Sequence, residues 1–224
     1  AQKRIRRSVV VGFEPLLNLT LQVFASLLLY DPDECRPFCN RRMGMQIGEA
    51  ASCVILEESD SAAAGKSGFA FAGGHLYNDN KSLTSAGTDG EMVRGVVSRA
   101  LLKAGTEPGE IVAVKAHGTG TRDNDLSEGR GLAKVFEKHL PPVVSLKATI
   151  GHTLGAAGTV ETALWLSCLE AGVIPKSFGF AETDPEIGFA PSQENLPAAA
   201  GAYLFTYFGF GGTCTAYVIR KMAS

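Results

Sequence analysis

The sequence predicts an α/β protein whose strands form a largely parallel sheet covered by helices on both faces. Short apolar or β-branched segments alternate with amphipathic helical segments along most of the chain, and glycine-flanked polar residues follow several of the predicted strands. The chain has 224 residues, of which 45% are hydrophobic and 20% are charged. It is therefore long enough and apolar enough to bury a substantial core.

The predicted order begins with a strand and a helix. Residues 8–13 form a β-branched run that indicates a buried strand, and residues 16–29 repeat apolar side chains at helical spacing until residues 31–33 end the helix. Residues 45–57 predict a long strand that becomes fully buried at its end. Residues 68–76 predict a second strand, which we expect to pair with it as a hairpin.

Helices and strands alternate in the rest of the chain. Residues 88–91 have the pattern of a capping box, and an apolar helical stripe follows until Gly105. From residue 45 onward the predicted order is ββαβαβαββ. Its later members are a strand at 111–116, a helix at 125–138, a strand at 143–146, a helix at 156–170 and strands at 202–207 and 213–220.

Charge and cysteine content exclude several classes of protein. The net charge of −2 gives no support to nucleic-acid binding, which needs a basic face. We expect no signal peptide, because Glu14 interrupts the first apolar run, and no membrane span, because residues 21–30 are far shorter than the required ~20 residues. The odd number of cysteines favours a reducing, cytoplasmic location. No metal site is expected, because Cys35 and Cys39 have no partner pair at ligand spacing.

Three glycine-flanked polar clusters follow predicted strands, at residues 117–121, 147–152 and 208–212. The carboxyl ends of parallel strands share one edge of a sheet, so we expect these clusters to converge. His117 and His152, with threonine hydroxyls and helix-start amides, would form a donor-rich site for an anion that develops on a carbonyl oxygen. From composition alone, a structural role and a catalytic role are about equally expected for each of these two histidines. For His75 and His139, a structural role is favoured.

Two further patterns carry less chemistry. A nucleotide site is not expected, because neither GxGxxG with a following acidic residue nor GxxxxGK[ST] is present. Asp123, Asp125, Glu128 and Glu137 lie on or near one predicted helix, and a solvated or capping role suits most of them.

These motifs resemble the β-ketoacyl synthases of fatty-acid and polyketide synthesis, within the thiolase superfamily. The resembling segments are 116–121 with Asn124, Asp125 and Glu128, then 145–152 continuing through 155–158 to Glu161, then 208–213, and also 35–38 and 48–50, with Cys39 in place of the usual acid. The resemblance implies a thiolase-like α/β fold. Residues 1–44 would be the end of its N-terminal half, and residues 45–224 would be its complete C-terminal half.

The resemblance also implies decarboxylative Claisen condensation of acyl and malonyl thioesters on acyl carrier protein. It assigns His117 and His152 to holding the malonyl thioester oxygen as enolate charge develops. Lys147 would orient the site with structural support from Glu161. The ring of Phe208 would gate access, and its backbone N–H would contribute to an oxyanion hole.

Further implications concern substrate, cofactor and partners. Thr119, Thr121 and Gly209 resemble residues that bind the phosphopantetheine arm, which arrives on acyl carrier protein, so no resident cofactor and no metal are expected. The implied partners are acyl carrier protein and either a complementary ketosynthase chain or a second copy in a homodimer, with neither nucleic acid nor membrane.

The nucleophile is the point at which the sequence departs from the family pattern. Family members carry a nucleophilic cysteine at a helix start upstream of the strand that residues 8–13 resemble, and none of the five cysteines here occupies that place. We therefore expect the nucleophile outside this chain. The alternative is a non-catalytic partner subunit similar to a chain-length factor. The presence of Lys147, His117 and His152 favours the enzyme, because buried polar groups are costly to keep without a role.

Overall fold

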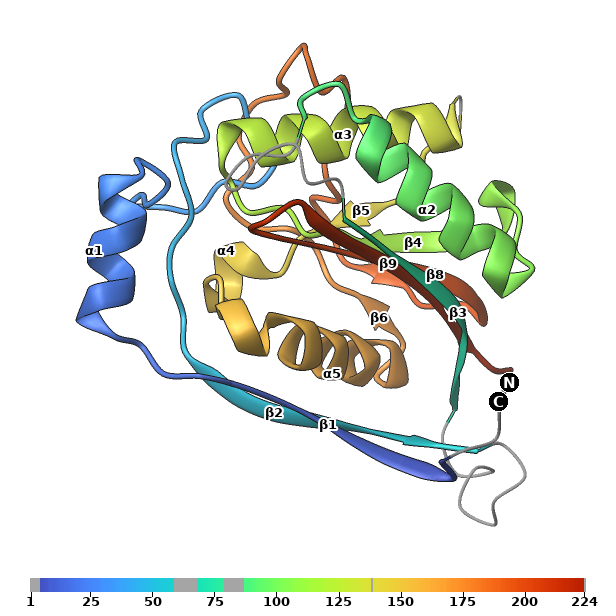
Figure 1. The fold of residues 1–224 in the computed structure, drawn as a ribbon. Helices are drawn as coiled ribbons and strands as arrows, with labels where there is room; N and C mark the ends of the chain where they lie inside the picture. The colour runs from blue at the N-terminus through green and yellow to red at the C-terminus, as the bar shows by residue number, and fades with distance from the viewer. Residues whose placement is uncertain (1–4, 59–67, 79–86, 138, 224) are drawn as a thin grey trace.

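The computed structural model describes residues 5–58, 68–78, 87–137 and 139–223 (Figure 1). Its centre is a five-stranded sheet in the order β3-β9-β8-β4-β5. These strands are β3 (Phe69–Asn78), β4 (Ile111–Lys115), β5 (Val143–Val144), β8 (Gly201–Gly209) and β9 (Thr213–Lys221). β4 is parallel to β5 and β8, whereas β9 is antiparallel to β8 and β3. The sheet is therefore mixed. The expectation of a largely parallel sheet is wrong, because a tight turn after β8 sends the chain straight back as β9.

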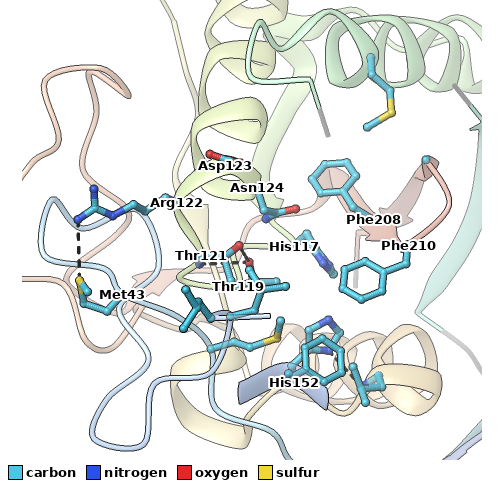
Figure 2. Close-up of a pocket in the computed structure, with 18 residues that line it drawn as sticks. Met43, His117, Thr119, Thr121, Arg122, Asp123, Asn124, His152, Phe208 and Phe210 are labelled. Atoms are coloured by element: carbon cyan, nitrogen blue, oxygen red, sulfur yellow. Dashed lines mark hydrogen bonds between the residues drawn. The ribbon is translucent and has the colours of Figure 1, made fainter. Parts of the chain in front are cut away.

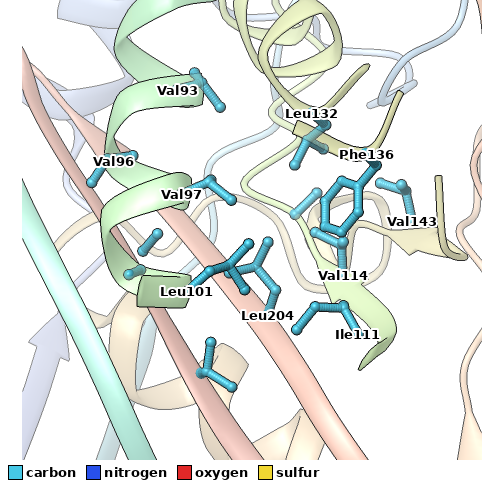
Figure 3. Packing of buried hydrophobic residues seen from close by; sticks show 14 of the residues in the cluster. Val93, Val96, Val97, Leu101, Ile111, Val114, Leu132, Phe136, Val143 and Leu204 are labelled. Atoms are coloured by element: carbon cyan, nitrogen blue, oxygen red, sulfur yellow. The ribbon is translucent and has the colours of Figure 1, made fainter. Parts of the chain in front are cut away.

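Helices cover both faces of this sheet, as the sequence predicted. α2 (Glu91–Ala104) and α3 (Arg122–Phe136) lie on one face and α5 (Ala157–Glu170) lies on the other (Figure 1). A hydrophobic core lies on each face of the sheet, and successive side chains of β8 point into one core and then the other. Leu204 packs with Val97 and Leu132 under α2 and α3 (Figure 3), while Phe205 packs with Trp165 of α5.

A second sheet lies beyond α5. Its strands are β1 (Arg7–Glu14) and β2 (Ala50–Glu57), which pair antiparallel, and α1 (Asn18–Ser26) follows β1. β1 passes so close to α5 that a Cβ at Gly12 would lie 2.1 Å from Oγ1 of Thr159. α5 is thus held between the two sheets (Figure 1).

Three expectations about the first strands are wrong. β2 pairs with β1 rather than with β3, and β3 instead joins the central sheet beside β9. Neither β1 nor the end of β2 is buried, since Val11 is 69% exposed and Ile55 is 58% exposed. The strand expected from residue 45 begins only at Ala50, because the backbone around Gln46 and Gly48 bonds to His152 instead of to a neighbouring strand.

Element boundaries differ at several further places. α2 has Gly90 at its N-cap in the left-handed conformation and no side-chain cap, so the expected capping box is absent, whereas Gly105 ends the helix as predicted. α3 begins at Arg122, before the expected start. Short elements escaped prediction: η2 (Pro108–Glu110), α4 (Lys147–Ile150), η3 (Leu154–Ala156), β6 (Val173–Ile174) and β7 (Leu196–Pro197). Within the described ranges, no helix has the length and apolar character needed to cross a membrane.

Candidate active site

A pocket of about 600 Å³ opens beyond the carboxyl ends of β4 and β8 (Figure 2). Its lining includes residues from all three clusters that the sequence singled out: His117, Thr119, Thr121, His152, Phe208 and Gly209. Arg122, Asp123 and Asn124, at the start of α3, add further polar side chains. Its apolar side includes Phe24 of α1, whose ring stacks on Phe210 at a centroid distance of 5.6 Å. The pocket is therefore a largely apolar cavity with a few convergent polar groups, which is typical of small-molecule sites.

The two histidines of the site lie edge to face. Their ring centroids are 5.2 Å apart with an interplanar angle of 82°. The ring of Phe208 lies 5.2 Å from that of His117 at 72°, although the two residues are far apart in sequence (Figure 2). The clusters after β4, after β5 and at the end of β8 thus converge on one pocket.

Hydrogen bonds to Nδ1 define the tautomer of each histidine. The backbone N–H of Leu154 donates to Nδ1 of His152 at 3.1 Å, and Nζ of Lys147 lies 3.3 Å from Nδ1 of His117. A lysine ammonium has only donors, so Nδ1 is the acceptor in both rings and each Nε2 carries the proton. Both imidazoles are therefore set up as hydrogen-bond donors through Nε2.

Both imidazoles are neutral near pH 7. Burial is the largest cause and the positive charge of Lys147 the second, and together they lower the pKa of His152 to about 3. The same two causes lower the pKa of His117 well below its ordinary value. A neutral imidazole can stabilise a developing oxyanion by donating a hydrogen bond from Nε2–H, and the proton stays on the ring.

Lys147 and Glu161 do not line the pocket but support His117 from behind. Nζ of Lys147 donates to Oε1 of Glu161 at 2.6 Å and to the backbone carbonyl oxygen of His117 at 2.8 Å. Both side chains are fully buried. Attraction from two lysines outweighs burial and lowers the pKa of Glu161, so the ion pair is formed at neutral pH.

The second lysine on Glu161 is Lys115, which sequence reasoning missed. It lies at the end of β4, is fully buried and reaches Oε2 of Glu161 at 2.5 Å. The available signal was a charged residue within the apolar run of a predicted buried strand, because lysine is rarely buried without a partner.

Glu128 holds the backbone at the end of β4. Its carboxylate accepts hydrogen bonds from the backbone N–H groups of His117 and Gly118, both at 2.8 Å, and from the hydroxyl of Thr206 at 2.6 Å. The expected solvated or capping role is therefore wrong for Glu128, and it is also wrong for Asp125, since both are 0% exposed. The loop after β4 folds back over the first turns of α3, which buries the side chains on that face of the helix.

Two threonines complete the polar wall. The hydroxyls of Thr119 and Thr121 lie 2.9 Å apart, and both residues are buried. Gly120 between them has φ of +78°, a conformation that places both neighbours on the pocket side.

All five cysteines lie in the described part of the chain, and none of them lines the pocket. Burial, with the charge of Asp125 nearby, raises the pKa of the Cys35 thiol to about 12, which leaves it protonated and a poor nucleophile. In the described ranges, no group of three or more histidine, cysteine, aspartate or glutamate side chains could hold a metal ion.

A helix held between two sheets, with site residues gathered at strand ends, is the arrangement of the thiolase fold. The structure superposes on the ishigamide ketosynthase/chain length factor with a TM-score of 0.90 and 26% sequence identity, covering 98% of this chain and 55% of that one. The fold class of the protein is therefore thiolase-like.

Within this class the chain belongs to the β-ketoacyl synthase family. Residues 70–181, half of the chain, match the family described as "Beta-ketoacyl synthase, C-terminal domain". The chain is 33% identical over 181 residues to 3-oxoacyl-[acyl-carrier-protein] synthase 2 of Mycobacterium tuberculosis, which covers 80% of this chain and 43% of that protein. It is 34% identical over 197 residues to the actinorhodin polyketide putative beta-ketoacyl synthase 1 of Streptomyces coelicolor, with 85% and 42% covered. The chain thus spans less than half the length of these two relatives.

Proposed function

We propose that this chain carries the malonyl-handling site of a β-ketoacyl synthase, an acyltransferase that condenses acyl and malonyl thioesters on acyl carrier protein. The observation that carries the proposal is the edge-to-face pair of His117 and His152, each neutral and each with Nδ1 occupied as an acceptor. Two Nε2–H donors at one end of an apolar pocket suit the oxygen of a thioester that becomes an enolate.

The reaction then proceeds in two steps. The malonyl group loses its carboxylate as CO2, and the electron pair of the broken bond forms the enolate, whose oxygen accepts hydrogen bonds from His117 and His152. The enolate carbon attacks the carbonyl carbon of the acyl thioester on a cysteine, a new carbon–carbon bond forms, and the cysteine leaves as a thiolate.

The other pocket residues serve binding and access. The hydroxyls of Thr119 and Thr121, with the backbone at Gly209, bind the phosphopantetheine arm, and the ring of Phe208 against His117 gates entry. The backbone N–H of Phe208 contributes to the oxyanion hole for the acyl carbonyl. The arm is part of the carrier protein, so no resident cofactor is needed.

The nucleophilic cysteine comes from outside this chain, on a complementary ketosynthase polypeptide or within a larger dimeric assembly. This is supported by the pocket lining, which includes none of the five cysteines. The free state of all five thiols supports a cytoplasmic, reducing location.

Intact-mass measurement on both polypeptides tests this proposal. The chain is combined with the polypeptide that carries the nucleophile and incubated with acyl and malonyl carrier thioesters. His152→Ala should reduce condensation about 100-fold or more, because one oxyanion donor is lost, while acyl mass still appears on the partner's cysteine. His139→Ala, which changes an exposed histidine, is the matched control and should leave condensation unchanged. Acyl mass on one of this chain's own cysteines would refute the assignment.

The second candidate is a non-catalytic subunit of the chain-length-factor kind. It is supported by the similarity to the ishigamide ketosynthase/chain length factor. The complete set of buried Lys147, Glu161 and neutral histidines weighs against it, because a subunit without chemistry gains nothing from these desolvated groups. A complex that binds acyl carrier protein but is never acylated would favour this candidate.

A further inference from the structure

Lys115 is the buried charged side chain whose role the proposed reaction leaves open. Its relative exposure is 0%, and its ammonium has three partners: Oε2 of Glu161 at 2.5 Å, the backbone carbonyl oxygen of Thr206 at 3.2 Å and the face of the Tyr207 ring at 3.6 Å. Burying an ammonium group is costly unless it is fully partnered, and here every direction of the group is satisfied.

The partners of Lys115 connect it to the site. Glu161 divides its two oxygens between two lysines, with Oε2 bonded to Lys115 and Oε1 bonded to Lys147. Lys147 in turn bonds the carbonyl oxygen of His117 and lies against Nδ1 of the same residue. A continuous chain of charge-assisted contacts therefore runs from Lys115 through Glu161 and Lys147 to the imidazole that lines the pocket.

We propose that Lys115 is a positioning residue that holds Glu161 in place. Lys147 then keeps its contacts with His117, and the Nε2–H of His117 keeps facing the pocket. With Lys115 present, Oε2 of Glu161 is occupied and Lys147 bonds only Oε1, which leaves its remaining donors for His117. Without Lys115, both carboxylate oxygens compete for the single remaining ammonium group and draw it away from the ring. The assignment to catalysis rests on the proposed function, whereas the effect on the histidine does not.

Electrostatics supports the same role. The charge of Lys115 contributes to the lowered pKa of both His117 and His152; burial and Lys147 contribute more to each, and His152 also contributes more to that of His117. A fixed positive charge behind the imidazoles keeps them neutral and favours negative charge in front of them.

The charge of Lys115 is itself sensitive to pH. The charged and titratable groups that face it are Glu161 on α5, Lys147 on α4, Glu128 on α3 and Tyr207 on β8. Burial lowers the pKa of Lys115 to about 8; the attraction of Glu161 opposes the fall and Lys147 adds to it. The positioning charge is therefore present at pH 7 and is lost as the pH rises through 8.

The direct test uses ¹⁵N spectra of the histidine side chains, recorded on the chain in its complex with the polypeptide that supplies the nucleophile. In the wild-type protein, His117 should show the Nε2–H tautomer at pH 7, and its Nδ1 signal should move with a midpoint near pH 8 as Lys115 loses its proton. In Lys115→Met the midpoint should vanish and the Nδ1 signal at pH 7 should match the alkaline wild-type signal. Lys134→Met, which removes a solvent-exposed ion pair, is the matched control and should leave the spectrum unchanged.

The kinetic test is malonyl decarboxylation measured against pH. Wild-type activity should fall above pH 8, and Lys115→Met should lose roughly 10- to 100-fold at pH 7 and no longer show this fall. If the spectra respond as expected but the wild-type complex has no decarboxylation activity, the positioning role stands and the proposed function fails. An unchanged Nδ1 signal of His117 at pH 7 in Lys115→Met, or in Lys115→Gln should Lys115→Met not fold, would overturn the positioning role.

Discussion

The backbone N–H of Phe38 donates a 2.7 Å hydrogen bond to Oδ2 of Asp125, across 87 positions of sequence. The same carboxylate accepts from the backbone N–H groups of Thr119 at 3.0 Å and Gly120 at 3.2 Å. One buried side chain therefore joins the segment before β2 to the loop that carries His117.

Asp125→Ala should destabilise the protein by about 3–5 kcal/mol, because three buried N–H groups lose their acceptor at once. The change in free energy of unfolding is measured by urea denaturation of the complex with the polypeptide that supplies the nucleophile, because the chain alone is expected to aggregate. Asp123→Asn, on the exposed side of the same helix turn, is the control and should cost no more than about 1 kcal/mol. Equal losses for the two variants would contradict the role assigned to Asp125.

Gly120→Ala should be more damaging than an ordinary glycine substitution. Gly120 has φ of +78°, and a Cβ there would lie 2.7 Å from the carbonyl oxygen of Gly44. Gly172 has φ of +79° with no atom within 4 Å of the added Cβ, so Gly172→Ala measures the conformational strain alone, about 1 kcal/mol. We expect Gly120→Ala to exceed it by at least about 2 kcal/mol in thermal or urea unfolding of the same complex, and similar values would show that the loop can yield.

His152 should make stability fall in acid. Burial lowers its pKa to about 3 in the folded chain, so between pH 3 and 6.5 the unfolded chain binds more protons, and stability rises with pH across that window. Lowering the pH from 7.5 to 5 should cost about 2 kcal/mol through this group.

His152→Asn retains an acceptor near Leu154 but no longer titrates. Between pH 7.5 and pH 5, the free energy of unfolding of this variant should therefore fall by about 2 kcal/mol less than that of wild type. Urea unfolding of wild type and variant, each in the complex with the polypeptide that supplies the nucleophile, measures the difference at pH 5 and pH 7.5. The pH dependence that remains in the variant includes the contribution of His117, whose pKa is lowered in the same direction. Identical slopes for wild type and variant would mean that His152 is accessible to protons.

The chain expressed alone should aggregate or fold poorly. Val9, Val11 and Phe13 share one face of β1, and Ile55 pairs with Val9 on the same face of β2. Val11 is 69% exposed, Phe13 65% and Ile55 58%, whereas Gly12 and Ser52 on the opposite face contact Thr159 of α5. An apolar strand face of this kind is an aggregation site unless another surface covers it.

Light scattering and size-exclusion chromatography measure this behaviour. Val11→Lys with Phe13→Thr should reduce association, because the two changes add charge and polarity only to the outer face. A compact, cooperatively melting monomer of the unaltered chain would refute the expectation.

Much of the local structure could be predicted from the sequence. α2, α5, β4, β8 and β9 follow their expected ranges closely, because their apolar periodicity, glycine punctuation and β-branched content are local properties. The pocket residues His117, His152 and Phe208 could also be selected, because each stands beside glycine at a predicted strand end.

Only the tertiary structure decided how these elements pair and what the buried charges do. β3 joins β9 rather than β2, since pairing depends on which faces the helices cover, and that information is spread over the whole chain. Asp125 and Glu128 resemble ordinary acidic residues of a helix in sequence, and they become buried acceptors only because the loop after β4 folds back onto α3. Lys115 lies 46 positions from Glu161, so a contact made by the packing of α5 against the sheet decides its role, and no local sequence pattern records that contact.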